Sequence, residues 1–143
     1  MKIHRIDHVG IIVNDLTAAK EFFVDFGLEV QGEWEGKWID QVVGLNDVKV
    51  ACVGLRAPDG QAWIELIKFY SSSDEREIQQ PFANTLGMQH IAFAVEDIEA
   101  VVAKLKKKGT EIFSGIQQYE DSYKLCFVRG PEGIILELAE KIK

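Results

Sequence analysis

An internal repeat constrains the fold of this 143-residue chain more than any other feature. The segment HVGIIVNDL at residues 8–16 returns as HIAFAVEDI at residues 90–98. Three residue types recur at one separation of 82 positions: the histidines His8 and His90, the aspartates Asp15 and Asp97, and the glycines Gly27 and Gly109. A chain that repeats itself in this way is expected to fold as two similar modules, with insertions and deletions confined to loops.

Both copies predict the element order βαβββ. Each begins with an apolar strand and continues into a helix, with an aspartate as helix cap and a glycine as helix stop. The first module is expected to contain strands at 2–13, 29–34, 48–55 and 62–69 and a helix at 16–26. The second is expected to contain strands at 88–95, 111–114, 122–128 and 134–139 and a helix at 98–108. Residues 1–143 would form one domain from modules at about 1–70 and 87–143, joined by a linker at 71–86.

Each module also carries a glutamate inside an apolar strand. Glu65 lies in WIELI (63–67) and Glu137 lies in ILELA (135–139). A carboxylate on an apolar sheet face is costly to desolvate unless it has a partner. Together with His8 and His90, the two glutamates could hold a divalent cation, and an octahedral ion would keep two positions open for substrate. Taken singly, each residue could instead be a hydrogen-bonded core histidine or an exposed carboxylate.

The net charge of −7 argues against nucleic acid or an anionic membrane as partner. The sequence contains no apolar stretch of the length that a signal peptide or a membrane span requires, which predicts a cytoplasmic protein. Cys52 and Cys126 lie in predicted strands among apolar neighbours, and we expect both to be buried free thiols.

The chain resembles the vicinal oxygen chelate superfamily, which includes glyoxalase I, methylmalonyl-CoA epimerase, extradiol dioxygenases and bleomycin resistance proteins. The resemblance rests on the paired βαβββ modules, the two histidine openings, the helix starts at residues 15–16 and 97–98, and the ending GPEGIILEL at 130–138. It implies an α+β fold in which two tandem modules form a curved mixed sheet around a cup, with helices on the outer face. It also implies a homodimer and a small-molecule substrate.

The pattern His8, Glu65, His90 and Glu137 is similar to the ligand set of bacterial glyoxalase I. The resemblance therefore implies a Ni, Co, Zn, Mn or Fe ion and a lyase or isomerase that acts through an enediolate. Glu137 would be the catalytic base, with Glu65 as the alternative. The chain departs from the bacterial enzyme at Ile12, where an arginine that contacts glutathione is expected, and at residues 68–70, where an Asn-Trp-Gly stretch is expected. A glyoxalase-like enzyme with a different substrate fits these departures.

Two alternatives remain open: an iron-dependent extradiol-type dioxygenase, and a metal-free binding protein of the bleomycin resistance type. Residues that could line the substrate cup are Trp63, Tyr119, Tyr123 and Arg129. Tyr119 and Tyr123 belong to a predicted loop at 117–124 between two strands. The alternatives are a solvated loop at 117–124, a core aromatic at Trp63 and a surface arginine at Arg129.

Overall fold

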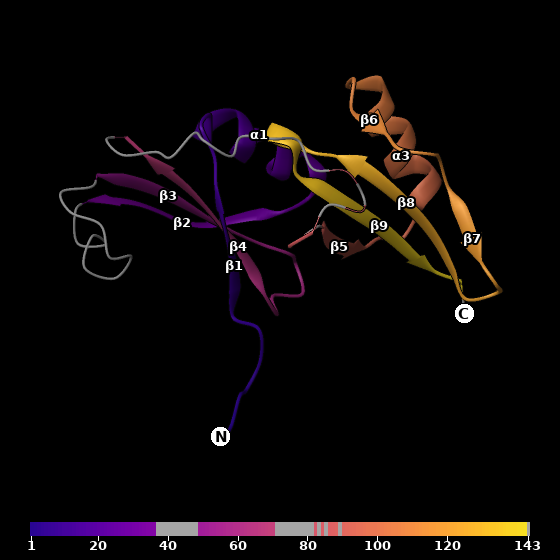
Figure 1. Cartoon of the computed structure of the whole chain (residues 1–143), viewed down its shortest axis with the longest axis horizontal. Helices are drawn as coiled ribbons and strands as arrows, with labels where there is room; N and C mark the ends of the chain where they lie inside the picture. Colours follow the sequence, from indigo (N-terminus) through magenta and orange to yellow (C-terminus); the bar gives the residue numbers. More distant parts are fainter. Residues whose placement is uncertain (37–48, 71–81, 83, 85, 89, 143) are drawn as a thin grey trace. The chain divides into compact units, whose positions relative to one another are not determined.

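The computed structural model describes the whole chain except residues 37–48, 71–81, 83, 85, 89 and 143 (Figure 1). The chain divides into two compact units, Met1–Ile78 and Gln79–Lys143, which we describe separately. Most of the predicted linker lies outside the described residues. Among the helices described, none has the length and apolar composition needed to cross a lipid bilayer.

In its described residues, the first unit consists of a four-stranded mixed sheet and a helix. Its elements are β1 (His8–Ile12), α1 (Leu16–Phe26), β2 (Glu29–Gly36), β3 (Val50–Arg56) and β4 (Trp63–Phe69). The strand order is β1-β4-β3-β2, where β1 runs parallel to β4 and the other neighbours are antiparallel. The parallel pair requires a crossover between β1 and β4, and this crossover contains α1.

The second unit repeats this topology. Its elements are β5 (His90–Ala94), α3 (Ile98–Lys107), β6 (Glu111–Ile112), β7 (Gln117–Tyr119), β8 (Tyr123–Arg129), a short 3₁₀ turn (Pro131–Gly133) and β9 (Ile135–Lys141). The order is β5-β9-β8-β6, with β5 parallel to β9, and β7 is paired with the N-terminal part of β8, Tyr123–Leu125. The predicted α+β fold of two βαβββ modules is therefore confirmed, with a separate mixed sheet in each module.

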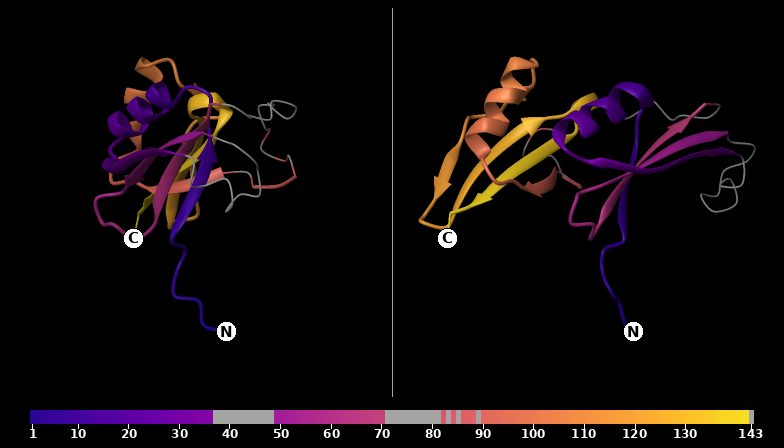
Figure 2. Two further views of the ribbon diagram at one scale, coloured as in Figure 1. Left: turned by 90° about the vertical axis from the view of Figure 1, so that its left-hand side faces the viewer. Right: turned by 180° about the vertical axis from the view of Figure 1, so that it is seen from behind.

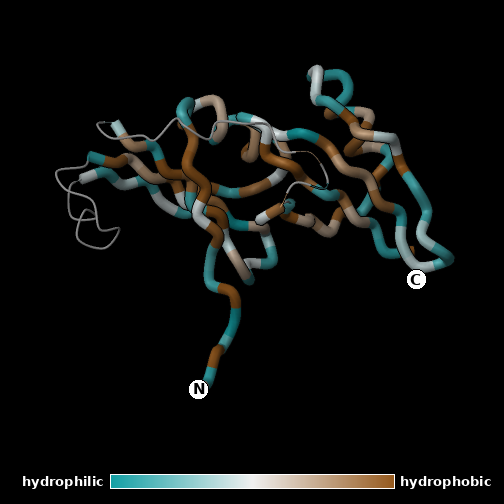
Figure 3. The backbone as a smooth tube through the Cα atoms, in the orientation of Figure 1, coloured by the Kyte–Doolittle hydropathy of each residue, from teal (hydrophilic) through white to brown (hydrophobic). Residues whose placement is uncertain are grey.

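Each helix covers one face of the sheet in its own unit (Figures 1 and 2). In β4, Ile64 and Leu66 are buried, whereas Trp63, Glu65 and Ile67 between them are only half-buried. This alternation is expected for a strand with one face against a helix, because successive side chains point to opposite faces. The core of the first unit thus lies between α1 and the strands, with Phe23 of α1 fully buried. Apolar stretches follow the strands in Figure 3, whereas the β7–β8 turn is hydrophilic.

In each unit, one predicted strand or loop differs from the structure. The loop predicted at 117–124 overlaps the strand predicted at 122–128, and the structure confirms that strand as β8; residues 117–119, for which no strand was predicted, form β7, which pairs with β8 in an antiparallel hairpin with Tyr119 opposite Tyr123. The predicted strand at 2–13 is shorter, because β1 begins at His8. The only described neighbour of β1 is β4, which begins at Trp63 opposite His8, and the Trp63 amide bonds to the Asp7 carbonyl, so β4 does not extend far enough to pair with residues 2–6.

Candidate metal site

The parallel register of β1 and β4 brings His8 and Glu65 to one sheet face. His8 is paired with Trp63, and Gly10 is paired with Glu65. Paired residues of neighbouring strands point to the same side, and residues two apart on a strand do so as well. His8, Trp63 and Glu65 therefore share the face that α1 does not cover. Gly10 leaves space beside Glu65, because a Cβ at that position would come no closer than 3.6 Å to Ile67 Cδ1.

The second unit has the same arrangement, and here the two side chains are in contact. His90 is paired with Ile135 and Ala92 with Glu137, so His90 and Glu137 share the face opposite α3. His90 Nε2 lies 3.3 Å from Glu137 Oε2, and the Glu137 side chain is 19% exposed. Two ligands bound cis at about 2.1 Å from one cation would lie about 3 Å apart, so this spacing suits a shared metal ion.

Aromatic rings pack against both histidines. The His8 ring stacks on Trp63 with a centroid distance of 4.3 Å and an interplanar angle of 24°. The His90 ring lies 5.0 Å from Phe127, which is paired with Glu137 across β8 and β9. Phe113 adds an edge contact to Phe127 at 6.2 Å. These rings give the donor atoms an apolar surround and restrict the orientation of both imidazoles.

Asp7 is a charged neighbour in direct contact with His8. Its Oδ2 lies 2.8 Å from His8 Nδ1, and its Oδ1 accepts a hydrogen bond of 2.9 Å from Arg5 Nη2. The hydrogen bond from His8, aided by the charge of Arg5, holds the pKa of Asp7 below its usual value. Asp7 is therefore an anion that accepts from both neighbours.

The sequence profile of the Glyoxalase/Bleomycin resistance protein/Dioxygenase superfamily matches residues 5–138. The chain belongs to this superfamily. Among solved structures, a glyoxalase family protein from Bacillus cereus is 37% identical with a TM-score of 0.94, over 100% of this chain and 97% of that one.

Two curated relatives match over nearly the whole chain. The uncharacterized protein YwbC of Bacillus subtilis (strain 168) is 29% identical over 141 residues, which cover 96% of this chain and 98% of YwbC. The uncharacterized protein YaeR of Escherichia coli (strain K12) is 27% identical over 140 residues, which cover 97% of this chain and 98% of YaeR. Membership of the superfamily is thus clear, whereas neither relative carries an assigned activity.

The two cysteines of this superfamily member are free and buried, as predicted. Cys52 is opposite Ile67 in the sheet, on the same face as Glu65. Burial, with a smaller contribution from the negative charge of Glu65, raises the pKa of Cys52 to about 11. Cys126 is opposite Leu138, and burial raises its pKa too. Both thiols are therefore protonated at neutral pH, which makes them poor nucleophiles and poor metal ligands.

The predicted substrate residues have different surroundings. Trp63 touches His8, as described above, whereas Tyr119 and Tyr123 are exposed on the β7–β8 hairpin. Tyr123 faces the same side of β8 as Phe127, four residues away, or about 13 Å along the strand. Tyr123 could therefore reach only a substrate that extends well beyond the His90–Glu137 pair.

Arg129 makes several contacts within its own unit. Its Nη1 donates a 3.2 Å hydrogen bond to the Gly133 carbonyl, its Nε lies 3.5 Å from Glu111, and its guanidinium lies 4.8 Å above the Phe113 ring. The side chain is only 10% exposed. These contacts give Arg129 a structural role, and its proposed contact with substrate remains a prediction. Phe113 and Phe127 were not predicted as site residues. Phe127 lies two residues before Arg129, so strand alternation would have placed it on the same face as Arg129.

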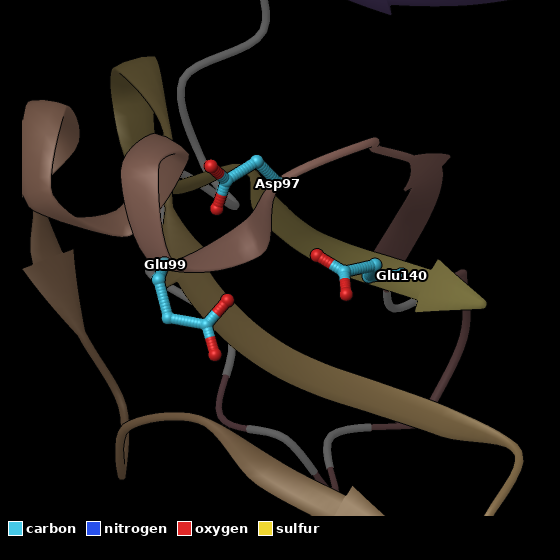
Figure 4. A group of neighbouring side chains, drawn as sticks. All are labelled: Asp97, Glu99 and Glu140. Atoms are coloured by element: carbon cyan, nitrogen blue, oxygen red, sulfur yellow. The ribbon is translucent and has the colours of Figure 1, made fainter. Parts of the chain in front are cut away.

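A second group of potential metal ligands lies at the start of α3. One carboxylate oxygen from each of Asp97, Glu99 and Glu140 lies within 4.8 Å of the others (Figure 4). Asp97 accepts a 3.1 Å hydrogen bond from the Ala100 amide, and Glu140 accepts one of 2.8 Å from the Ile98 amide. Such acceptors satisfy the unpaired N–H groups of a helix N-terminus.

Glu99, the third member of this acidic group, pairs with a lysine. Lys124 Nζ lies 2.7 Å from Glu99 Oε1. The first module does not reproduce the group, because Lys68 occupies the position equivalent to Glu140 and donates a hydrogen bond to the Asn14 carbonyl. Helix capping and an ion pair account for the acidic group without a cation.

Proposed function

We propose that this superfamily member is a glyoxalase-like metalloenzyme, a lyase or isomerase that acts on a small substrate with adjacent oxygens. Its metal ligands would be His8, Glu65, His90 and Glu137. The observation that carries the proposal is the contact of 3.3 Å between His90 Nε2 and Glu137 Oε2 on the sheet face opposite α3. The equivalent placement of His8 and Glu65 in the first unit supports it.

The four side chains suit a divalent cation that also binds substrate. Two neutral imidazoles and two carboxylates would neutralise the charge of the ion. Bound there, a divalent cation would supply Lewis-acid polarisation of two adjacent substrate oxygens. Ni, Co, Zn, Mn and Fe all accept nitrogen and oxygen ligands of these types, so the residues do not select one metal.

Glu137 is the proposed base. Its carboxylate would remove a proton from the substrate carbon next to a polarised carbonyl and return that proton to the neighbouring carbon. The half-buried position beside His90 and opposite Phe127 limits its contact with water, which helps a carboxylate act as a base. Glu65 is the alternative, because it occupies the equivalent position in the first module.

Metal content tests the proposal, and the chain offers a matched control. We expect the purified protein, reconstituted separately with each of the five divalent ions, to hold one ion per chain by elemental analysis. His8→Ala and His90→Ala are expected to lose the ion, whereas His4→Ala should retain it, because His4 has no counterpart in the repeat. An unloaded wild-type protein, or equal loss in all three variants, would contradict the proposal.

The other outcomes distinguish the alternatives. Iron binding with oxygen consumption on catechols would indicate a dioxygenase. A protein that binds no metal but does bind small aromatic molecules would indicate a sequestering protein of the bleomycin resistance type.

A proton-transfer assay shows whether Glu137 or Glu65 is the base. We expect Glu137→Gln to keep the bulk of its metal but lose at least about 100-fold in the rate of solvent deuterium exchange into substrate. Full exchange activity in Glu137→Gln, together with loss in Glu65→Gln, would assign the base to Glu65.

We also propose a homodimer, which light scattering at micromolar concentration tests.

A further inference from the structure

The contact between Asp7 and His8 bears on which imidazole nitrogen can bind a metal. Asp7 Oδ2 lies 2.8 Å from His8 Nδ1. An ionised carboxylate can only accept hydrogen bonds, so Nδ1 must carry the proton of this bond. In a neutral imidazole the other nitrogen, Nε2, then has a free lone pair, which is the form that metal ligation requires.

Two further contacts fix Asp7 and the His8 ring. The Asp7 carbonyl accepts a 3.2 Å hydrogen bond from the Trp63 amide, which anchors Asp7 at the start of β1 against β4. The His8 ring is stacked on the Trp63 indole at 4.3 Å. Arg5 lies 2.9 Å from the other Asp7 oxygen and favours the ionised carboxylate. The ring therefore has a defined plane and a defined hydrogen-bonded edge.

We propose that Asp7 is a positioning residue for metal binding. It holds His8 in the Nδ1–H tautomer and leaves Nε2 as the nitrogen that can bind a divalent cation. This inference rests on the proposed function, because it takes His8 as a ligand. Removing a carboxylate that is hydrogen-bonded to the second nitrogen of a ligating histidine typically weakens metal binding about 10- to 100-fold.

The repeat makes this contribution specific to the first module. The residue before His90 is Gln89, whose placement lies outside the described residues, so the sequence supplies no carboxylate there. Charge-assisted hydrogen bonds are stronger than neutral ones. The charged Asp7 acceptor should therefore fix the tautomer of His8 more strongly than an amide side chain could.

The tautomer can be measured without any metal. Nitrogen-15 NMR correlation spectra of the metal-free protein distinguish Nδ1–H from Nε2–H, and the chain has only three histidines to assign. We expect neutral His8 to be in the Nδ1–H form in the wild type and to lose this preference in Asp7→Ala. An Nε2–H tautomer for His8 in the wild type would overturn the inference.

Metal affinity provides the second measurement, by competition of Zn²⁺ or Ni²⁺ with a chromophoric chelator. We expect Asp7→Ala to bind about 10- to 100-fold more weakly. Asp7→Asn, whose amide oxygen can still accept from Nδ1, should fall between Asp7→Ala and wild type. The matched control is Glu33→Gln, because Glu33 has the same 55% side-chain exposure as Asp7 and an equally short 2.9 Å contact with a cation, Lys20.

The outcomes separate this inference from the proposed function. Metal binding that is unchanged in Asp7→Ala, or weakened equally in Glu33→Gln, would overturn the role of Asp7 and leave the metal site intact. Absence of metal binding in the wild type would refute the proposed function itself, and this inference with it. An Asp7→Ala protein with the expected tautomer change and weaker binding supports the role.

Discussion

The two helices begin with equivalent aspartates, and their caps should differ in energetic importance. Asp15 Oδ1 accepts a 3.0 Å hydrogen bond from the Ala18 amide, and Asp97 Oδ1 accepts one of 3.1 Å from the Ala100 amide. The second helix has an additional acceptor, because Glu140 bonds to its first amide at 2.8 Å. Replacement of each aspartate by alanine therefore compares a helix start capped by Asp15 with one at which Glu140 supplies a second acceptor beside Asp97.

The expected magnitudes follow from these contacts. Loss of an aspartate cap costs about 1 kcal/mol, within a range of about 0.5–2. Asp15→Ala should incur this cost in full. Asp97 lies within 4.8 Å of another carboxylate, that of Glu140, and two unit charges at that distance repel by about 0.9 kcal/mol in bulk water before salt screening. Asp97 is also attracted to Lys124, whose pKa its charge helps to raise, so these two electrostatic effects oppose each other. We expect Asp97→Ala to cost less than Asp15→Ala chiefly because Glu140 still accepts from the Ile98 amide.

Urea unfolding followed by circular dichroism measures these differences, and amide hydrogen exchange in each helix localises them. The control substitutions are Asp15→Asn and Asp97→Asn, because asparagine retains the cap and removes only the charge. We expect Asp15→Asn and Asp97→Asn both to be nearly neutral. An Asp97→Ala cost equal to or above that of Asp15→Ala, or a marked destabilisation by Asp97→Asn, would refute the capping account of the acidic group.

Two further predictions concern titratable groups. Because burial raises the pKa of Cys52 to about 11 and that of Cys126 above its usual value, neither thiol should react appreciably with a disulfide reagent at pH 8 until the protein unfolds; rapid reaction of the native protein would contradict this. The hydrogen bond from Lys124 lowers the pKa of Glu99, so this carboxylate stabilises the fold above its unfolded pKa, and the stabilisation is lost as pH falls through the lower folded pKa. Glu99→Gln should therefore lower the melting temperature at pH 7 but have no effect near pH 2, and a shift of equal size at both values would argue against the ion pair.

Local features of the sequence were sufficient to predict much of the fold. Asp15 and Asp97 cap the two helices as expected, and Gly27 follows α1 with a positive φ of 123° that favours glycine. These features depend on residues within one helical turn of each other. The period-2 pattern around Glu65 also predicted the half-buried face of β4.

Features that depend on distant partners were not predicted. β7 was expected to be part of a loop, because its polar residues resemble a solvated turn and its pairing with the predicted strand β8 is a tertiary property. The contacts of Arg129 with Glu111 and Phe113 depend on the pairing of β6 with β8. Sequence patterns alone do not specify which strands become neighbours.

The repeat by itself determined that two modules would each carry a histidine in the first strand and a glutamate in the last. Strand alternation is a property of the backbone, so the sequence could also assign these residues to particular faces. Only the tertiary structure decided that the first and last strands of each module are adjacent and parallel, which places His90 Nε2 against Glu137. The contact of Asp7 with His8 Nδ1 likewise became visible only in three dimensions, because side-chain rotamers and hydrogen-bond partners are selected by packing against β4.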